Sequence, residues 1–184
     1  LGFREEVNVG FANYISAATN PELWAGFGRM LHVGLLAVPL TLGLALLFAL
    51  LLDSPRVRLA RFSRLAIFVP YAVPGVIASL MWGFIYLPGV SPIRDAVAAI
   101  GLTPPDFFGP QTVFSSIANI SIWGSVGFNM VILYTALRGI PSELYDAARV
   151  DGCSEWQIAL HIKLPLLMPA VVLTGLFAIV GTIQ

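Results

Sequence analysis

The sequence predicts an all-α fold, a polytopic transmembrane helical bundle with four spans, on three observations. The chain has 184 residues, of which 58% are hydrophobic and 11% charged, whereas a soluble domain carries about 25% charged residues. Four stretches contain no Asp, Glu, Lys or Arg, and each exceeds the roughly 20 residues that a helix needs to cross a bilayer. None of them alternates polar and apolar residues as a β-barrel strand does, and no amphipathic helices remain to bury them in a soluble protein. The stretches are Met30–Leu52, Leu65–Ile93, Pro110–Leu137 and Leu164–Gln184.

A helix-start signal precedes the first span. Asn20–Glu22 combines an Asn cap, a proline at the first helical position and an acidic side chain in the first turn. Trp24 and Phe27 follow, as aromatic residues do near the membrane surface. We therefore expect residues 1–29 to form an external segment that leads into a transmembrane domain over residues 30–184.

The basic residues set the orientation of the spans. Seven of the ten lie in the connections that follow the first and third spans, and an excess of this kind marks cytoplasmic loops. We therefore expect residues 53–64 and 138–164 to be cytoplasmic and residues 95–109 to be external, with successive spans running in opposite directions. The seven are Arg56, Arg58, Arg61, Arg64, Arg138, Arg149 and Lys163.

Prolines and small residues predict local features of the bundle. Pro39, Pro70 and Pro74 are expected to kink the first and second spans. The group Gly124–Gly127 favours close packing of the third span against a neighbour. In the turn-rich outer connection, residues 91–100 indicate a short helix.

Motifs for catalysis or cofactor binding do not occur in the sequence. It contains neither the phosphate-binding pattern GxxxxGK[ST] nor the nucleophile pattern GxSxG. His32 and His161 have no partner at metal-ligand spacing, and the single cysteine, Cys153, excludes a multi-cysteine site. Zero net charge gives no indication of nucleic-acid binding. We therefore expect no catalytic residue, metal, cofactor or nucleic-acid partner.

The connection after the third span has the pattern helix–glycine–helix. Pro141 and Ser142 start the first helix, and Gly152 suits the left-handed residue that ends it. Ser154 and Gln157 then form a capping box that starts a second helix, which is expected to yield near Pro165. Acidic side chains and two small alanines on the first helix suit contact with a basic partner, although the same pattern also fits an ordinary cytoplasmic loop.

This connection resembles the cytoplasmic EAA loop in the permease subunits of binding-protein-dependent ABC importers. The family pattern is roughly E-A-A-x-x-D-G-A, followed by I-x-L-P; residues 146–153 read D-A-A-R-V-D-G-C and residues 162–165 read I-K-L-P. Residues 65–86 look like the span at the same position in the family. The resemblance covers residues 13–184 and is closest to the carbohydrate-uptake branch.

The chain departs from the family pattern at two positions. Asp146 stands where the family usually has Glu and is one methylene shorter, and Cys153 replaces an alanine. The family also normally has one more span before this region and one after it. The chain opens with Leu1 and stops at Gln184 inside an apolar run, so we expect the protein to continue on both sides.

The resemblance implies the permease core of a type I ABC importer in the bacterial or archaeal cytoplasmic (inner) membrane. The implied partners are a separate ABC ATPase subunit, a second and related permease subunit, an extracytoplasmic solute-binding protein and the lipid bilayer. ATP hydrolysis is expected on the ATPase and not on this chain. The EAA loop is the coupling helix that sits in a cleft of the ATPase. The coupling residues are then Glu143, Asp146, Ala147, Ala148, Asp151 and Gly152.

Polar side chains of the third span are candidates for the solute pathway. A sugar or polyol needs hydrogen-bonding groups and stacking surfaces in an otherwise apolar lining. The same side chains also suit hydrogen bonds between helices of the bundle, so both interpretations stay open. The candidates are Ser116, Asn119, Trp123 and Asn129.

Three other functions remain as alternatives. The leading one is a membrane scaffold whose cytoplasmic loop docks a partner without transport. A secondary transporter is disfavoured, because the four spans hold no carboxylate of the kind that proton-coupled pumps use. An intramembrane enzyme would need a nucleophile and a base, and no such pair is evident.

Overall fold

The computed structural model describes residues 10–54, 57 and 59–183, and within them every regular element is a helix. Arg56 and Arg58, two of the basic residues used for the orientation, and residues 1–9 of the predicted external segment lie outside this range. The helices are α1 (Ala12–Thr19), α2 (Pro21–Asp53), α3 (Ala60–Phe68), η1 (Val69–Ala72), α4 (Gly75–Tyr86), α5 (Pro92–Ala99), α6 (Val113–Arg138), α7 (Ser142–Val150), α8 (Glu155–Ile158), η2 (Ala159–Lys163) and α9 (Leu164–Ile183).

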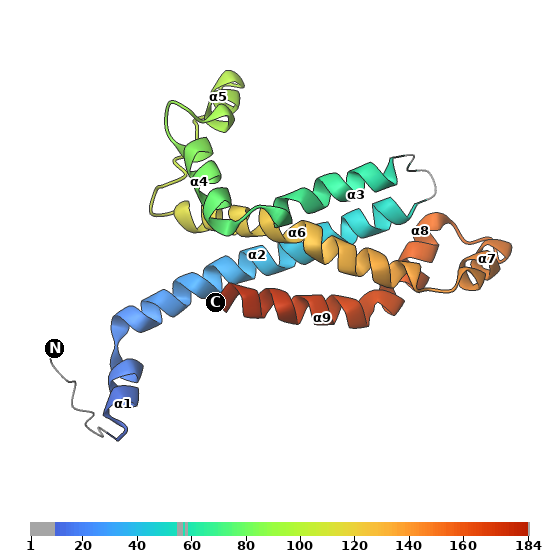
Figure 1. Cartoon of the computed structure of the whole chain (residues 1–184), viewed down its shortest axis with the longest axis horizontal. Coiled ribbons are helices and arrows are strands. Elements are labelled where there is room, and N and C mark those ends of the chain that lie inside the picture. Colours follow the sequence, from blue (N-terminus) through green and yellow to red (C-terminus); the bar gives the residue numbers. More distant parts are fainter. Residues whose placement is uncertain (1–9, 55–56, 58, 184) are drawn as a thin grey trace.

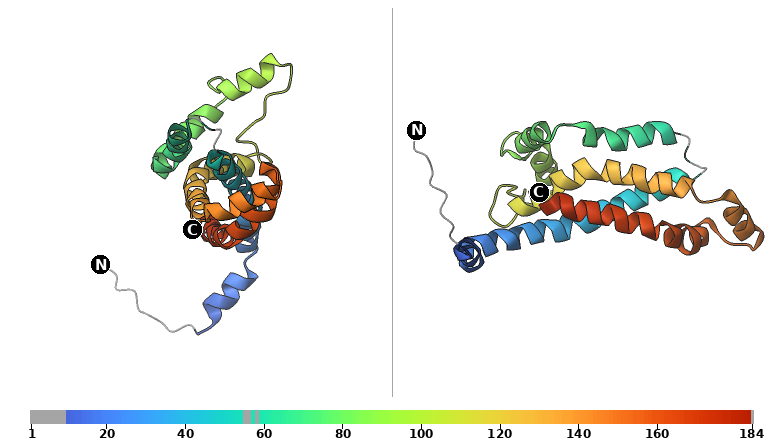
Figure 2. Two further views of the ribbon diagram at one scale, coloured as in Figure 1. Left: turned by 90° about the vertical axis from the view of Figure 1, so that its right-hand side faces the viewer. Right: turned by 60° about the horizontal axis from the view of Figure 1, so that its bottom comes forward.

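The helices α2, α6 and α9 lie side by side, and α3 runs along α6 (Figures 1 and 2). At one end of this bundle α4 and α5 turn outward, and at the other end α7 projects beyond the helix ends (Figure 1). The described residues of the predicted external segment and the outer connection are thus at one end, and the described residues of both predicted cytoplasmic connections are at the other. The alternating directions of the spans agree with the arrangement expected from the basic residues.

The core of the bundle is built on small residues of α2. Ala37, Thr41, Ala45 and Ala49 recur every four residues and are buried, so one narrow face of α2 permits close approach by its neighbours. Larger side chains from α6 and α9 fill the space opposite this face. They include Met130, Leu133, Leu137 and Leu167, each at most 1% exposed.

Three helical stretches are long and apolar enough to cross a membrane: α2, α6 and the run over residues 155–182. They confirm the first, third and fourth predicted spans. The second predicted span is a bent pair of helices, in which α3–η1 and α4 meet at an angle of 97°. Pro74 causes the break: proline drives the residue before it out of the helical region, and Val73 is extended. Pro70 lies inside η1, and Val69 before it stays helical. The kink expected at Pro74 is confirmed, whereas α2 passes through Pro39 without a break.

A glycine of α6 lets the broken span approach closely. A Cβ at Gly127 would overlap the carbonyl oxygen of Ile67 and lie 2.8 Å from Cα of Phe68. The backbone of α6 therefore touches the backbone near the end of α3, which only glycine permits. The close packing expected for Gly124–Gly127 is confirmed at Gly127, whereas Gly124 faces open space.

The helix of the first span begins before residue 30. Asn20 caps the helix, with its side chain accepting a hydrogen bond from the Glu22 N–H at 2.9 Å, as the sequence predicted. The helix then continues without interruption into the first span, so the last nine residues of the predicted external segment belong to the same helix as the span. A helix of 33 residues extends about 50 Å, well beyond the hydrocarbon thickness.

Other local predictions concern helix ends. The short outer helix is present as α5, capped by Ser91, which accepts from the Arg94 N–H at 3.2 Å. The capping box of Ser154 and Gln157 is also present. The helix that it starts does not yield near Pro165, contrary to the prediction. Instead η2, a π-helical turn, links α8 to α9, and its wider turn accommodates the missing N–H and the ring of the proline.

Candidate functional site

The helix α7 ends in a glycine turn that fixes the shape of the loop. Gly152 has φ +82° and donates its N–H to the carbonyl of Arg149 at 3.1 Å, while Cys153 donates to the carbonyl of Ala148 at 2.9 Å. This pair of bonds is the Schellman arrangement, in which a left-handed residue satisfies the last carbonyls of a helix. The positive φ predicted for Gly152 is confirmed, and the chain turns there from α7 into α8.

The acidic side chains of α7 and its turn face outward. Glu143, Asp146 and Asp151 are all exposed. Asp146 forms an ion pair with Arg149 at 3.1 Å, and Arg149 also pairs with Glu155 at 3.3 Å. These pairs are exposed, so each contributes at most about 1 kcal/mol and leaves the carboxylates available to a partner.

The two alanines of the loop have different roles. Ala148 is buried, 7% exposed, whereas Ala147 faces outward. Only Ala147 can therefore allow close approach by another protein. Ala148 is covered by the protein itself and is not available to a partner.

Two exposed apolar side chains of the loop were missed by the sequence analysis. Val150 is 88% exposed at the end of α7, and Trp156 is 71% exposed on α8. A large apolar residue that stays exposed beside charged groups is typical of a contact surface. The only sequence signal was the position of Trp156 inside the capping box. Together with Glu143, Asp146, Ala147 and Asp151 these residues form the surface that we call the α7 knob.

Charged side chains join the base of α7 to the bundle. Lys163 Nζ lies 2.6 Å from Asp53 Oδ2, and both side chains are nearly buried, 11% and 7% exposed. Arg138 lies 4.0 Å from the same carboxylate. The ammonium of Lys163 also lies 5.1 Å from the ring centre of Tyr145, a cation–π distance. The ends of α2, α6 and α9 thus meet α7 around one carboxylate.

The ring of Tyr145 contacts Lys163, whereas its hydroxyl is buried and has no hydrogen-bond partner among the described residues. Burial raises the pKa of Tyr145 above its ordinary value of 10.0, the negative charge of Asp53 raises it further, and Arg138 opposes the rise. The neutral phenol is therefore the form that the folded junction favours.

The predicted pathway residues of α6 lie in two places. Near the outer end, the Asn119 amide donates to the Tyr86 hydroxyl at 2.8 Å, and Ser116 donates to the carbonyl of Phe107 at 2.9 Å. Trp123 packs edge-on against Trp82. Ser116 and Asn119 line a cavity of about 330 Å³ whose other walls include Trp82, Tyr86 and Phe107.

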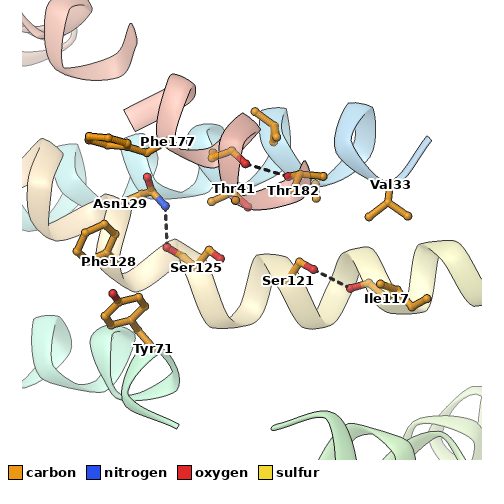
Figure 3. A pocket seen from close by; sticks show the side chains of 14 residues that line it. Val33, Thr41, Tyr71, Ile117, Ser121, Ser125, Phe128, Asn129, Phe177 and Thr182 are labelled. Atoms are coloured by element: carbon orange, nitrogen blue, oxygen red, sulfur yellow. Dashed lines mark hydrogen bonds between the residues drawn. The ribbon is translucent and has the colours of Figure 1, made fainter. Parts of the chain in front are cut away.

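Asn129 lines a different cavity, of about 380 Å³, between α2, η1, α6 and α9. Figure 3 shows the polar side chains of three helices around it: Thr41 from α2, Asn129 from α6 and Thr182 from α9. The rings of Tyr71 and Phe128 are stacked 4.7 Å apart at its edge. Thr41 and Thr182 could not be predicted from the sequence, because only the packing of the helices places them in the same cavity lining as Asn129. The Asn129 amide donates to the carbonyl of Ser125 at 2.9 Å.

The described part of the chain contains no candidate metal site. No three side chains of His, Cys, Asp or Glu there are grouped so that they could hold a metal ion. The site therefore consists of an exposed knob at one end of the bundle and polar cavities along α6. Such an arrangement can bind a protein and a small polar molecule.

Comparisons with known proteins agree on one family. The family model described as binding-protein-dependent transport system inner membrane component matches residues 24–184. The diacetylchitobiose uptake system permease of Streptomyces coelicolor is 31% identical over 92% of this chain and 52% of its own length. The osmoprotective compounds uptake permease of a Synechocystis species is 34% identical, over 86% and 59% respectively. The trehalose/maltose transport system permease of Thermococcus litoralis is 29% identical, over 91% and 57%.

A solved structure shares the fold. The crystal structure of a bacterial ABC transporter involved in the import of the acidic polysaccharide alginate matches with a TM-score of 0.85 over 95% of this chain and 62% of that one, at 19% identity. This chain spans roughly half to three fifths of the length of the relatives that it matches. The resemblance found in residues 146–165 is confirmed, and the chain belongs to the family of binding-protein-dependent transport system inner membrane components.

Proposed function

We propose that this chain forms part of the solute pathway of a carbohydrate ABC importer in the bacterial or archaeal cytoplasmic membrane, as one of a pair of permease subunits. Two relatives are named for the uptake of diacetylchitobiose and of trehalose and maltose, which supports a sugar or a related polyol as the solute. ATP is hydrolysed on a separate ATPase subunit. An extracytoplasmic binding protein delivers the solute, as in the alginate importer whose structure includes a periplasmic protein bound to an alginate pentasaccharide.

The α7 knob is the proposed contact with the ATPase. The observation that carries this proposal is the position of the knob: it projects beyond the bundle (Figure 1), and Tyr145 of α7 contacts Lys163, which is paired with Asp53 at the end of α2. A movement of α7 that the ATPase imposes is then transmitted to α2, α6 and α9 together. Carboxylates at the surface of α7 attract arginine or lysine of the ATPase, and Val150 and Trp156 supply the apolar area.

Uptake and subunit co-purification test this proposal together. Glu143→Ala combined with Asp146→Ala in the assembled importer is expected to lower retention of the ATPase on the purified permease and to lower uptake of radiolabelled trehalose, maltose and diacetylchitobiose. Asp95→Ala, an acidic residue of α5 at the opposite end of the bundle, is the control for ATPase retention. Normal retention in the double variant would contradict the coupling role.

We also infer that the solute contacts the cavity around Asn129. Hydroxyl and amide groups from three helices and the stacked rings of Tyr71 and Phe128 match what a sugar requires. Asn129→Ala is expected to weaken uptake of the same three sugars without loss of the ATPase. Asn119→Ala tests the outer cavity in the same way, and its amide also supports α4 through Tyr86. Normal uptake in both variants would assign both residues to packing alone.

The alternative of a scaffold without transport makes a different prediction for the same measurements. A scaffold keeps its partner through the α7 knob but moves no solute. Retention of an ATPase in the absence of uptake of any of the three sugars, with the binding protein present, would favour it.

A further inference from the structure

Beside α3 and α6, away from both cavities, the structure contains a basic cleft of about 510 Å³. Three arginines line it: Arg61 and Arg64 from α3 and Arg138 from the end of α6. All three lie near the end of the bundle that carries α7 (Figure 1). No acidic side chain is among the described residues that line the cleft, so the cleft concentrates positive charge.

One arginine of the cleft is held in place. The guanidinium of Arg64 lies 4.6 Å from the ring centre of Tyr134, and its Nε donates to the carbonyl of Ala60 at 3.2 Å. These contacts leave the terminal nitrogens of Arg64 free of the described acidic groups. Arg138 is only 4.0 Å from Asp53, but Asp53 is bonded more closely to Lys163, so the positive charge of Arg138 is incompletely balanced.

The remaining wall of the cleft is apolar and open. Leu65 is 60% exposed on α3 and Val131 is 36% exposed on α6. Val131 lies in a helix that is long and apolar enough to cross a membrane, and Leu65 lies in the bent pair of helices that passes the same test only together. The cleft thus has charge at the membrane surface and apolar side chains toward the hydrocarbon, which is the pattern of a single amphipathic ligand.

We propose that this cleft binds the headgroup of an anionic phospholipid, with the phosphate on Arg61, Arg64 and Arg138 and the acyl chains along Leu65 and Val131. Basic pockets between transmembrane helices on the cytoplasmic side bind such headgroups, and arginine binds phosphate through two parallel hydrogen bonds. This proposal rests on the cytoplasmic placement of this end of the bundle under the proposed function. A lipid bound there would bridge α3 and α6 and tie the broken span to the rest of the bundle.

Lipid retention on the assembled, detergent-purified importer tests the proposal. The complex is equilibrated with equal amounts of phosphatidylglycerol and phosphatidylcholine of identical acyl chains, and the bound lipids are counted by native mass spectrometry. The protein with its native sequence is expected to retain phosphatidylglycerol preferentially. Arg61→Gln with Arg64→Gln is expected to lower this preference roughly ten-fold, whereas Arg29→Gln, a control at the opposite end of α2, is expected to leave it unchanged.

Two further measurements distinguish lipid binding in the cleft from a general effect of positive charge. Thr135→Trp keeps every charge but fills the cleft at an exposed position on α6, and it is expected to abolish the preference even if the double glutamine variant fails to assemble. Excess inorganic phosphate is expected not to displace the lipid. Displacement by phosphate alone would identify a site for free phosphate instead, and an unchanged preference in the Thr135→Trp variant would overturn the proposal. Uptake is not the readout, so failure here is distinguishable from failure of the transport function.

Discussion

Lys163 and Asp53 are 110 residues apart in the chain and 2.6 Å apart in space. Both side chains are nearly buried, so neither charge can be lost without cost to the other. A buried charge whose partner is removed costs about 3–5 kcal/mol. The pair therefore fixes where η2 meets the end of α2. It thereby also fixes the position of α7.

Removal of one partner is expected to destabilise the protein severely. Asp53→Asn should lower the thermal unfolding midpoint of the detergent-solubilised protein, because the ammonium of Lys163 is left unpaired apart from the ring of Tyr145. Asp53→Leu combined with Lys163→Met should recover most of the loss, since an apolar pair of similar size leaves no buried charge. An equal loss in the single and the double variant would show that the unpaired charge of Lys163 is not the cause of the destabilisation.

A second stability prediction concerns the contact between α6 and the broken span. Gly127→Ala should cost about 1–3 kcal/mol, because the added methyl overlaps the backbone of Ile67 and backbone atoms cannot move aside. Gly124→Ala is the matched control on the same helix. Nothing lies within 4 Å of its Cβ position, and alanine favours the helix over glycine. Thermal unfolding of the two variants should therefore shift in opposite directions.

Local features of this fold could be predicted from the sequence, because their causes are local. The caps at Asn20, Ser91 and Ser154 and the turn at Gly152 each depend on a side chain and the few residues around it. The long apolar stretches predict the spans for the same reason. The break at Pro74 could also be expected, but the angle of 97° between α3–η1 and α4 could not.

Features that join distant residues could not be predicted. The pairing of Lys163 with Asp53 requires α2 and η2 to meet, and η2 itself replaces a predicted break by a π-helical turn. The cavity around Asn129 depends on the packing of α2 and α9 against α6. The sequence could therefore suggest polar residues of α6, but it could not show that Asn129 lies apart from Asn119.

Tyr145 makes the stability of the junction depend on pH. Its pKa is raised in the folded protein by burial and then by Asp53, so the unfolded chain loses this proton first as the pH rises through 10.0. Stability from this effect is fully present below that pH and is lost above it. Tyr145→Phe should therefore reduce the fall in unfolding midpoint between pH about 8 and about 11, and it should cost little at the lower pH because the hydroxyl has no described partner. Tyr14→Phe, at an exposed position on α1, is the control.

The orientation of the bundle can be tested by cysteine labelling in intact cells. With Cys153 replaced by serine, a cysteine at Leu59 should stay unlabelled by a membrane-impermeant maleimide, and one at Ile100 should be labelled. Both positions are well exposed, 68% and 72%, so a lack of labelling reports the side of the membrane. Labelling of both after permeabilisation is the control. The opposite pattern in intact cells would reverse the predicted topology.

Three substitutions of Gly152 distinguish the cost of backbone strain from the loss of contact with the ATPase. Because φ is +82° and nothing lies within 4 Å of a Cβ there, Gly152→Ala should cost only about 1 kcal/mol of backbone strain. Gly152→Asn should cost less, since asparagine tolerates this conformation. Under the proposed coupling role, Gly152→Val adds bulk at the contact with the ATPase, so it should release the ATPase and abolish uptake while the spans still insert. Co-purification of the ATPase and sugar uptake measure the three variants side by side. Normal transport by the valine variant would remove Gly152 from the coupling surface and strengthen the scaffold interpretation.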